Sequence, residues 1–368
     1  MPCTQYFFNA KAVTQSRQSG FTLVEILVSL ALTSIIATSV VQFYSSNHIT
    51  EQLNNGLTHL QQNAQLALLL IEKDILLVNY QGCSDPYKNF INTSENSLQA
   101  NSAPLTNLLL DGLQGFEITS ANNTSWADGT NLTDIEGNVL IGSDVFSIMS
   151  ASTTATTLSS SMAATNSSIA VGTNPNNLAE GELLLIASCS DATLFRASAV
   201  STGNPVTISH VFGGASDENS SASFNSIYGT DAKIHKFSYN TYYVALNSAN
   251  IPALHRRDVD GNVDELVEGI ENIQVLYGQH DVNGTETDLS DDRIRFVSAN
   301  DSSLNMQQVD RIQIALLVGS DTQILNEDTS DSFDLLGSQV APYVSDKQMR
   351  RVFTTSIQLR NRKPYLME

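Results

Sequence analysis

The chain has 368 residues, with 18 lysines and arginines against 38 aspartates and glutamates, and a formal net charge of −20. This acidity excludes proteins that coat nucleic acids or hold anionic membrane surfaces through basic residues, because phosphate groups would repel the chain. Hydrophobic residues make up 41% and charged residues only 15%, so the composition is that of a folded protein with a substantial core.

The first 44 residues divide into a basic leader and a long apolar segment. Residues 1–20 contain Lys11 and Arg17 and no acidic residue, whereas residues 21–44 carry a single charge, Glu25. A helix over residues 21–44 would be roughly 36 Å long and could cross a hydrocarbon core of about 30 Å. Because no further basic residue occurs until Lys73, the positive-inside rule places the N-terminus in the cytoplasm and the chain after about residue 45 outside.

Glu25 is unusual, because a carboxylate inside a membrane segment is costly and is commonly functional. An alternative role for Glu25 lies within its own helix. Thr22-x-x-Glu25 matches a capping box, in which the hydroxyl and the carboxylate satisfy the first amides of a helix. A short basic leader, Gly20 and then Phe-Thr-Leu-Val-Glu at the head of an apolar helix together resemble the class III signal of type IV pilins and type II secretion pseudopilins.

That resemblance implies how the N-terminus is processed. A prepilin peptidase would cut after Gly20 and methylate the new amine of Phe21, and Glu25 would set the register by pairing with the amine of a neighbouring subunit. The expected segments are a cleaved leader (1–20), a transmembrane and fibre-core helix (21–44), an amphipathic continuation of that helix (45–80) and an extracytoplasmic head (81–368).

The pattern after the apolar segment supports this organisation. From Ile49 to Val78 apolar residues recur at spacings of three and four, which predicts one stripe along an amphipathic helix. Beyond Tyr80, short apolar runs separated by polar loops predict strands at roughly 139–149, 182–188, 192–200, 205–212, 235–246, 266–278, 309–319 and 351–360. The fold class is therefore α+β, with a long N-terminal helix packed on a mostly antiparallel β head. The segment 150–168, which is rich in Ser, Thr and Ala, is expected to be a surface loop or an irregular edge.

Three cysteines permit at most one disulfide, and Cys3 lies in the leader. Cys83 and Cys189 both lie outside the cytoplasm in this topology, so we expect them to pair in an oxidising periplasm. Two buried free thiols are the alternative.

Four further segments narrow the resemblance to the PilW family of minor pilins. They are Gly82-Cys83, the strand that ends at Cys189, the segment 268–278 and the closing segment 351–362. Their order after a prepilin start is similar to that family over nearly the whole chain.

No nucleophile elbow, zinc-protease motif, phosphate-binding loop or Cys-x-x-Cys occurs in the sequence, so we expect no enzyme and no required cofactor. Two acidic clusters suit calcium, which takes hard oxygen ligands, although neither matches a full EF-hand. The alternative is that their Asp-Gly and Asn-Gly pairs form hairpin turns with solvated acidic tips. The candidate ligands are Asp258, Asp260, Asn262, Asp264, Asp281, Asn283 and Asp288.

The resemblance implies a minor pilin that primes or caps a type IV pilus by helix packing with other minor and major pilins. Its partners would be those pilins, the prepilin peptidase and the inner-membrane assembly platform, with no specific nucleic acid. It would lie in the inner membrane as a single pass and then in the surface pilus, with roles in twitching motility or adhesion. The alternatives are a tip adhesin and a minor pseudopilin of type II secretion.

Overall fold

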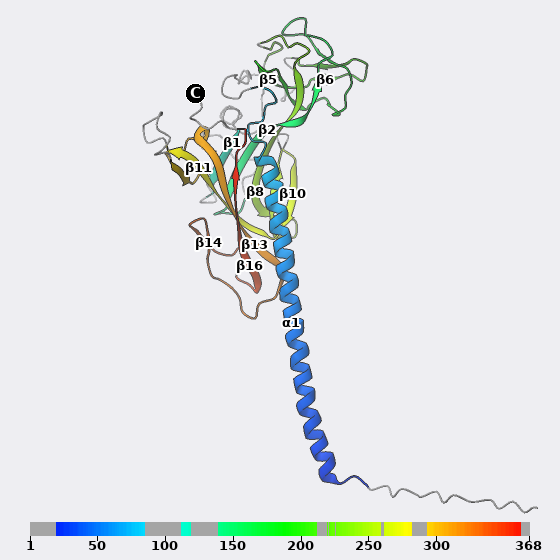
Figure 1. Cartoon of the computed structure of the whole chain (residues 1–368), viewed down its shortest axis with the longest axis vertical. Helices are drawn as coiled ribbons and strands as arrows, with labels where there is room; N and C mark the ends of the chain where they lie inside the picture. The colour runs from blue at the N-terminus through cyan, green and yellow to red at the C-terminus, as the bar shows by residue number, and fades with distance from the viewer. Residues whose placement is uncertain are drawn as a thin grey trace, which may run out of the picture. The chain divides into compact units, whose positions relative to one another are not determined.

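The computed structural model describes residues 20–84, 112–118, 139–211, 219, 221–224, 226–258, 261–281 and 293–361 (Figure 1). The chain divides into two compact units, Met1–Asn54 and Asn55–Glu368, and helix α1 (Leu23–Ile75) contributes to both. The second unit is called the head below.

In the first unit the described residues are an extended start and the first part of α1. Every side chain from Gly20 to Tyr44 is exposed, including Phe21, Phe43 and Tyr44. The segment has no proline and no glycine after Gly20, so no residue interrupts the helical hydrogen bonds.

In the head, α1 buries the predicted stripe. Its buried residues are spaced by three or four and face one side of the helix: Gly56, Leu60, Ala64, Ala67, Ile71 and Ile75. The helix was expected to run from Phe21 to Val78, and it instead covers Leu23–Ile75. The chain then turns through Asn79, whose φ of 61° lies in the left-handed region.

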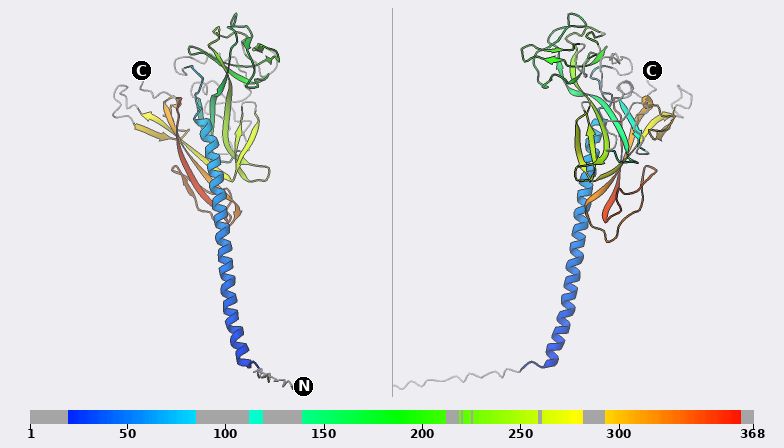
Figure 2. Two further views of the ribbon diagram at one scale, coloured as in Figure 1. Left: turned by 45° about the vertical axis from the view of Figure 1, so that its right-hand side comes forward. Right: turned by 180° about the vertical axis from the view of Figure 1, so that it is seen from behind.

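Two antiparallel sheets flank the head part of α1 (Figure 2). The first has the order β1-β2-β8-β4-β5, and β9 and β10 extend it from β8. Its strands are β1 (Leu113–Glu117), β2 (Asp144–Thr157), β4 (Leu183–Ala187), β5 (Ala192–Arg196), β8 (Lys233–Leu246), β9 (Pro252–Arg257) and β10 (Val263–Glu268).

The second sheet has the order β12-β11-β13-β16. Its strands are β11 (Ile270–Asp281), β12 (Arg293–Val297), β13 (Val309–Gln323) and β16 (Gln348–Gln358), with the 3₁₀ turn η1 (Met306–Gln308) before β13 and the hairpin β14 (Phe333–Leu335) and β15 (Ser338–Val340) before β16. The main core joins the helix to both sheets, for example through Leu60, Ile71, Tyr242, Ile273 and Leu316. The predicted α+β class is confirmed.

A separate lobe has its own core. It contains the small sheet β3 (Ile169–Val171), β7 (Val206–Ser209) and β6 (Ala199–Val200), with a cluster that includes Leu158, Phe195, Phe224 and Tyr228. The segment 150–168 was expected to be a surface loop or an irregular edge, and its first part is the end of β2, which continues to Thr157 beyond the residues that pair with β1. There Thr156 pairs with Ile234 of β8 after a bulge, so the segment is held in a ladder despite its polar composition.

Candidate functional site

The first functional element is the start of α1. Thr22 lies just before the helix, and its N–H donates to Glu25 Oε2 at 2.9 Å, while the N–H of Glu25 donates to Thr22 Oγ1 at 3.3 Å. The capping box predicted from the sequence is therefore present. Gly20 and Phe21 are exposed, with no other heavy atom within 4 Å of a Cβ built at Gly20. The scissile bond expected from the sequence thus lies in exposed, non-helical chain.

The second element is the apolar face of the same helix. By length and composition α1 is the one helix of the described residues that could cross a membrane, and none of its apolar part is buried by the described residues. The hydroxyls in this part donate to main-chain carbonyls one turn back, as Ser29 does to Glu25 O and Thr33 to Ser29 O, both at 2.7 Å. Polar groups satisfied within the helix suit a hydrocarbon environment.

The third element holds the end of α1 to the head. Asp74 Oδ2 accepts hydrogen bonds from the hydroxyl of Tyr242 at 2.5 Å and from Asn240 Nδ2 at 2.8 Å. Burial, and then the charge of Asp74, raise the pKa of Tyr242, so its hydroxyl stays a donor. Asn361 Nδ2 donates to the carbonyls of Leu76 and Val78, both at 3.1 Å. These carbonyls follow the last helical turn, where acceptors lack helical partners.

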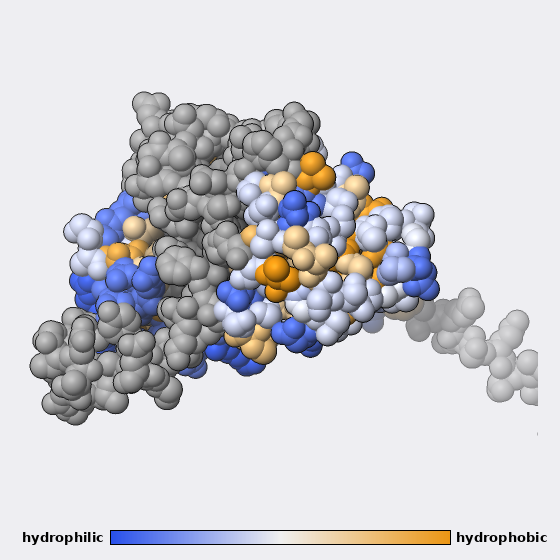
Figure 3. Space-filling model, turned by 90° about the horizontal axis from the view of Figure 1, so that it is seen from above, coloured by the Kyte–Doolittle hydropathy of each residue, from blue (hydrophilic) through white to orange (hydrophobic). Residues whose placement is uncertain are grey.

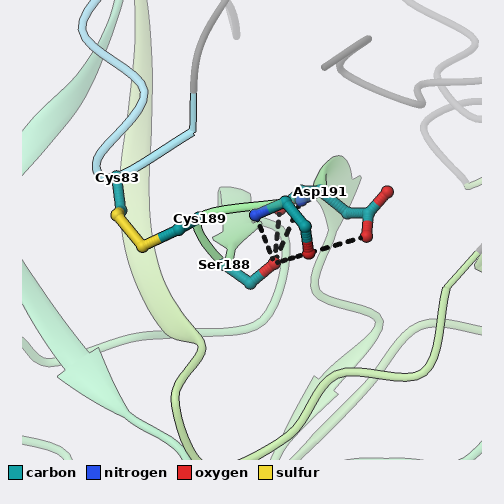
Figure 4. Close-up of a disulfide and its surroundings, with 5 residues drawn as sticks. Cys83, Ser188, Cys189 and Asp191 are labelled. Carbon is teal, nitrogen blue, oxygen red and sulfur yellow. Dashed lines mark hydrogen bonds between the residues drawn. A yellow bond between two sulfur atoms is a disulfide. The ribbon is translucent and has the colours of Figure 1, made fainter. Parts of the chain in front are cut away.

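The fourth element is a covalent link. Cys83, just after the helix, forms a disulfide with Cys189, with the Cα atoms 4.7 Å apart (Figure 4). Cys189 lies in the turn between β4 and β5, where Ser188 Oγ accepts from the N–H of Asp191 at 3.0 Å and the Ser188 N–H donates to Asp191 O at 2.8 Å. The predicted pairing is present, and it fastens the chain after α1 to this turn.

The first candidate calcium cluster forms a hairpin tip. Asn262 donates to both carboxylate oxygens of Asp258, through its main-chain N–H at 2.8 Å and its Nδ2 at 2.9 Å. Asp264 pairs with Arg256 at 2.8 Å across the β9–β10 ladder. These contacts are those of a hairpin turn, with Gly261 in the left-handed region at φ 86°, whereas Asp260 of the Asp-Gly pair lies outside the described residues.

The remaining candidate ligands are not described. Asp260, Asn283 and Asp288 lie outside the described residues, and of Asp281 only the main chain in β11 is described. Among the residues that the structure describes, no group of three or more His, Cys, Asp or Glu side chains could hold a metal. Calcium binding stays a prediction.

Sequence reasoning missed Asp74 and Asp144 as structural carboxylates. Asp74 stands beside the buried stripe of α1, and a carboxylate so close to an apolar face is a usable signal. Asp144 opens β2 and accepts from the main-chain N–H of Val275 in the other sheet at 2.7 Å. Its partner lies 131 residues away, so the sequence offers no local signal for this bond.

Comparison with protein families agrees with this geometry. Residues 15–41 match the prokaryotic N-terminal methylation motif, and residues 241–361 match the family described as type IV pilus-assembly protein W. The two matches support a PilW-type minor pilin. The first match contains Gly20, Phe21 and Glu25, and the second runs from β8 to Asn361. Neither a curated protein nor a solved structure matches the chain.

The matches also indicate where the protein lies in the cell and to which general class it belongs. The methylation motif and the apolar helix are those of an inner-membrane, single-pass pilin with a periplasmic head. Pilin families are structural, and the two family matches point to interaction with other components of a type IV pilus. The lobe around β3, β6 and β7 lies outside both matched regions.

Proposed function

We propose that this PilW-type pilin is processed after Gly20, methylated at Phe21, and inserted with other minor pilins into a complex that primes type IV pilus assembly. The observation that carries the proposal is the combination in one chain of an exposed prepilin junction, an apolar helix that buries nothing within its own chain, and a PilW-type head. An apolar face without an internal partner needs lipid or other helices to cover it.

In this mechanism the first part of α1 supplies packing surface and Glu25 supplies register. Among the described residues the carboxylate of Glu25 is held by the N–H and the hydroxyl of Thr22. In a fibre, the cationic amine of a neighbour's Phe21 would compensate the charge of Glu25 more strongly than a hydroxyl does. The prepilin peptidase and the inner-membrane assembly platform are the further partners of this proposal.

The test is complementation of a deletion strain with the full chain and its prepilin peptidase. We expect a mature N-terminus of methyl-Phe21 by mass spectrometry, loss of surface pili in the deletion strain, and poor restoration by Glu25→Ala. Glu51→Ala, an exposed glutamate on the same helix beyond the apolar segment, is the matched control and should restore pili fully. An uncut leader, or normal pili in the deletion strain, contradicts the proposal.

A second candidate is a binding subunit at the pilus tip. It is favoured by the lobe with its own core outside the family match, which is rich in Ser, Thr and Asn. Figure 3 shows apolar side chains scattered among polar ones on the face seen from above. Loss of adhesion with normal pilus number on removal of this chain would support the binding role. Loss of exoprotein secretion instead would support a type II secretion pseudopilin.

A further inference from the structure

A cavity of about 240 Å³ lies in the head where several segments meet. It is lined by α1, the start of β9, the junction of β10 and β11, the end of β13 and the segment that leads into β16. All of these segments belong to the head, and none of the residues assigned above to processing or register lines the cavity.

One wall of the cavity is a buried ion-pair network. Arg350, with 1% of its side chain exposed, donates through Nε to both carboxylate oxygens of Glu271 at 2.8 and 2.9 Å and through Nη1 to Asp346 at 2.8 Å. Glu271 also accepts from the main-chain N–H of Tyr343 at 3.1 Å, and Arg350 Nη2 donates to Val344 O at 2.9 Å. Two carboxylates therefore enclose one guanidinium, and the network fixes the segment 343–346 at the cavity.

Two further carboxylates at the cavity have no basic partner among the described residues. They belong to Glu268, at the end of β10, and Asp321, in the last part of β13, and both residues are exposed. Four acidic side chains thus face the cavity against the single charge of Arg350, which leaves an excess of negative charge.

The same cavity has an apolar rim. Ile251 is 37% exposed, Tyr343 is 44% exposed and Val344 is 51% exposed. A lysine or arginine side chain combines an apolar stem with a cationic end, and it packs its stem on apolar surface while its charge reaches polar partners. The acidic residues of the cavity complement the charge of such a side chain, and the apolar rim complements its stem.

We propose that the cavity receives a lysine or arginine side chain from a neighbouring pilin of a different kind. The proposal rests on the proposed function, because it requires that the chain assemble with other pilins. A divalent cation is a poorer occupant, since no group of three candidate ligands exists among the described residues. Arg350 is the one basic residue that lines the cavity, and its charge is already compensated.

The experiment is site-specific photo-crosslinking of the full chain in piliated cells. Tyr343 is replaced by p-benzoylphenylalanine, and the crosslinked peptides are identified by mass spectrometry. The yield is compared between the otherwise native chain, the double charge reversal Glu268→Lys with Asp321→Lys, and Glu327→Lys. Glu327 is exposed and does not line the cavity, so its reversal shows the effect of a positive charge placed elsewhere on the head. Immunoblotting confirms equal amounts of disulfide-bonded chain.

We expect a product with another pilin whose crosslinked peptide contains or adjoins a lysine or arginine. The double reversal should reduce its yield about tenfold or more, because like charges would then meet at the contact, and Glu327→Lys should leave it unchanged. Changing the partner's basic residue to glutamate in the double-reversal strain should restore the product.

A product that is insensitive to the double reversal, or one formed only with a second copy of this chain or with a protein other than a pilin, overturns the cavity proposal. Pilus counts separate the two proposals. If the deletion strain has normal pili, the priming function fails whatever the crosslinks show. If the deletion strain lacks pili and the yield of the crosslinked product is unchanged by the double charge reversal, only the cavity proposal fails.

Discussion

Asp144 at the start of β2 accepts a hydrogen bond from the main-chain N–H of Val275 in β11, and this 2.7 Å contact joins the two sheets of the head. The side chain of Ser143 accepts in the same way from the N–H of Ile273 at 3.2 Å. Two consecutive side chains, one just before β2 and one at its first residue, therefore satisfy main-chain donors of the other sheet.

Burial raises the pKa of Asp144 to about 8, more strongly than the bond from Val275 lowers it, and the charge of Glu117 raises it further. The folded state therefore keeps a proton that the unfolded state releases near pH 4. Between about pH 4 and pH 8 the folded chain binds more protons, so this group lowers the free energy of unfolding as pH rises through that window.

Asp144→Asn should remove this pH dependence. The amide keeps an oxygen that accepts from Val275 and carries no charge to bury, so we expect a higher melting temperature than wild type at pH 8 and a similar one at about pH 4. The measurement is thermal unfolding of the detergent-solubilised chain across that range, with the exposed Asp328→Asn as control. If the melting temperatures of Asp144→Asn and wild type changed equally with pH, Asp144 would not be the cause of the pH dependence.

Tyr277 is fully buried beside Asp144, and its hydroxyl has no hydrogen-bond partner among the residues that the structure describes. Removing an unsatisfied buried hydroxyl should avoid a desolvation cost of about 1–3 kcal/mol. Tyr277→Phe is therefore expected to be neutral or stabilising in urea unfolding, whereas Tyr242→Phe, which removes the bond to Asp74, should destabilise. A clear loss of stability in Tyr277→Phe would mean that the hydroxyl is satisfied, for example by a buried water.

The Arg350 network should be sensitive to removal of one partner. Arg350→Met leaves Glu271 buried and uncompensated, with an expected cost of about 3–5 kcal/mol in the free energy of unfolding. Arg256→Met breaks a more exposed pair with Asp264 and should cost about 0–1 kcal/mol. Adding Glu271→Gln to Arg350→Met should recover part of the loss. Equal effects of the two single variants would contradict the burial argument.

The sequence was sufficient to predict the elements whose patterns are periodic. The stripe of α1 and strands such as β4, β8 and β13 follow from apolar spacing, and the prepilin start predicted the N-terminal methylation motif that residues 15–41 match. β9 was missed because its sequence, Pro-Ala-Leu-His-Arg-Arg, looks polar. In the structure His255 stacks on Tyr243 with ring centroids 5.5 Å apart, and Arg257 is buried. Contacts between residues that are distant in the sequence decide whether such a segment forms a strand. The hydrogen bond from Asn361 to the carbonyl of Leu76 likewise joins residues that are far apart in the sequence.

The disulfide should matter most for the head. Cys83 and Cys189 are 106 residues apart, so the bond restricts a long loop in the unfolded chain, and the chain-entropy model gives a stabilisation of about 4–5 kcal/mol. Because both partners are needed, Cys83→Ser, Cys189→Ser and the double variant should lose the same amount of stability. We expect each to reduce the level of mature chain in the periplasm, while Cys3→Ser, which lies in the leader, should not. Full stability of the double variant in urea unfolding would show that packing around Tyr80 and the β4–β5 turn suffices without the covalent link.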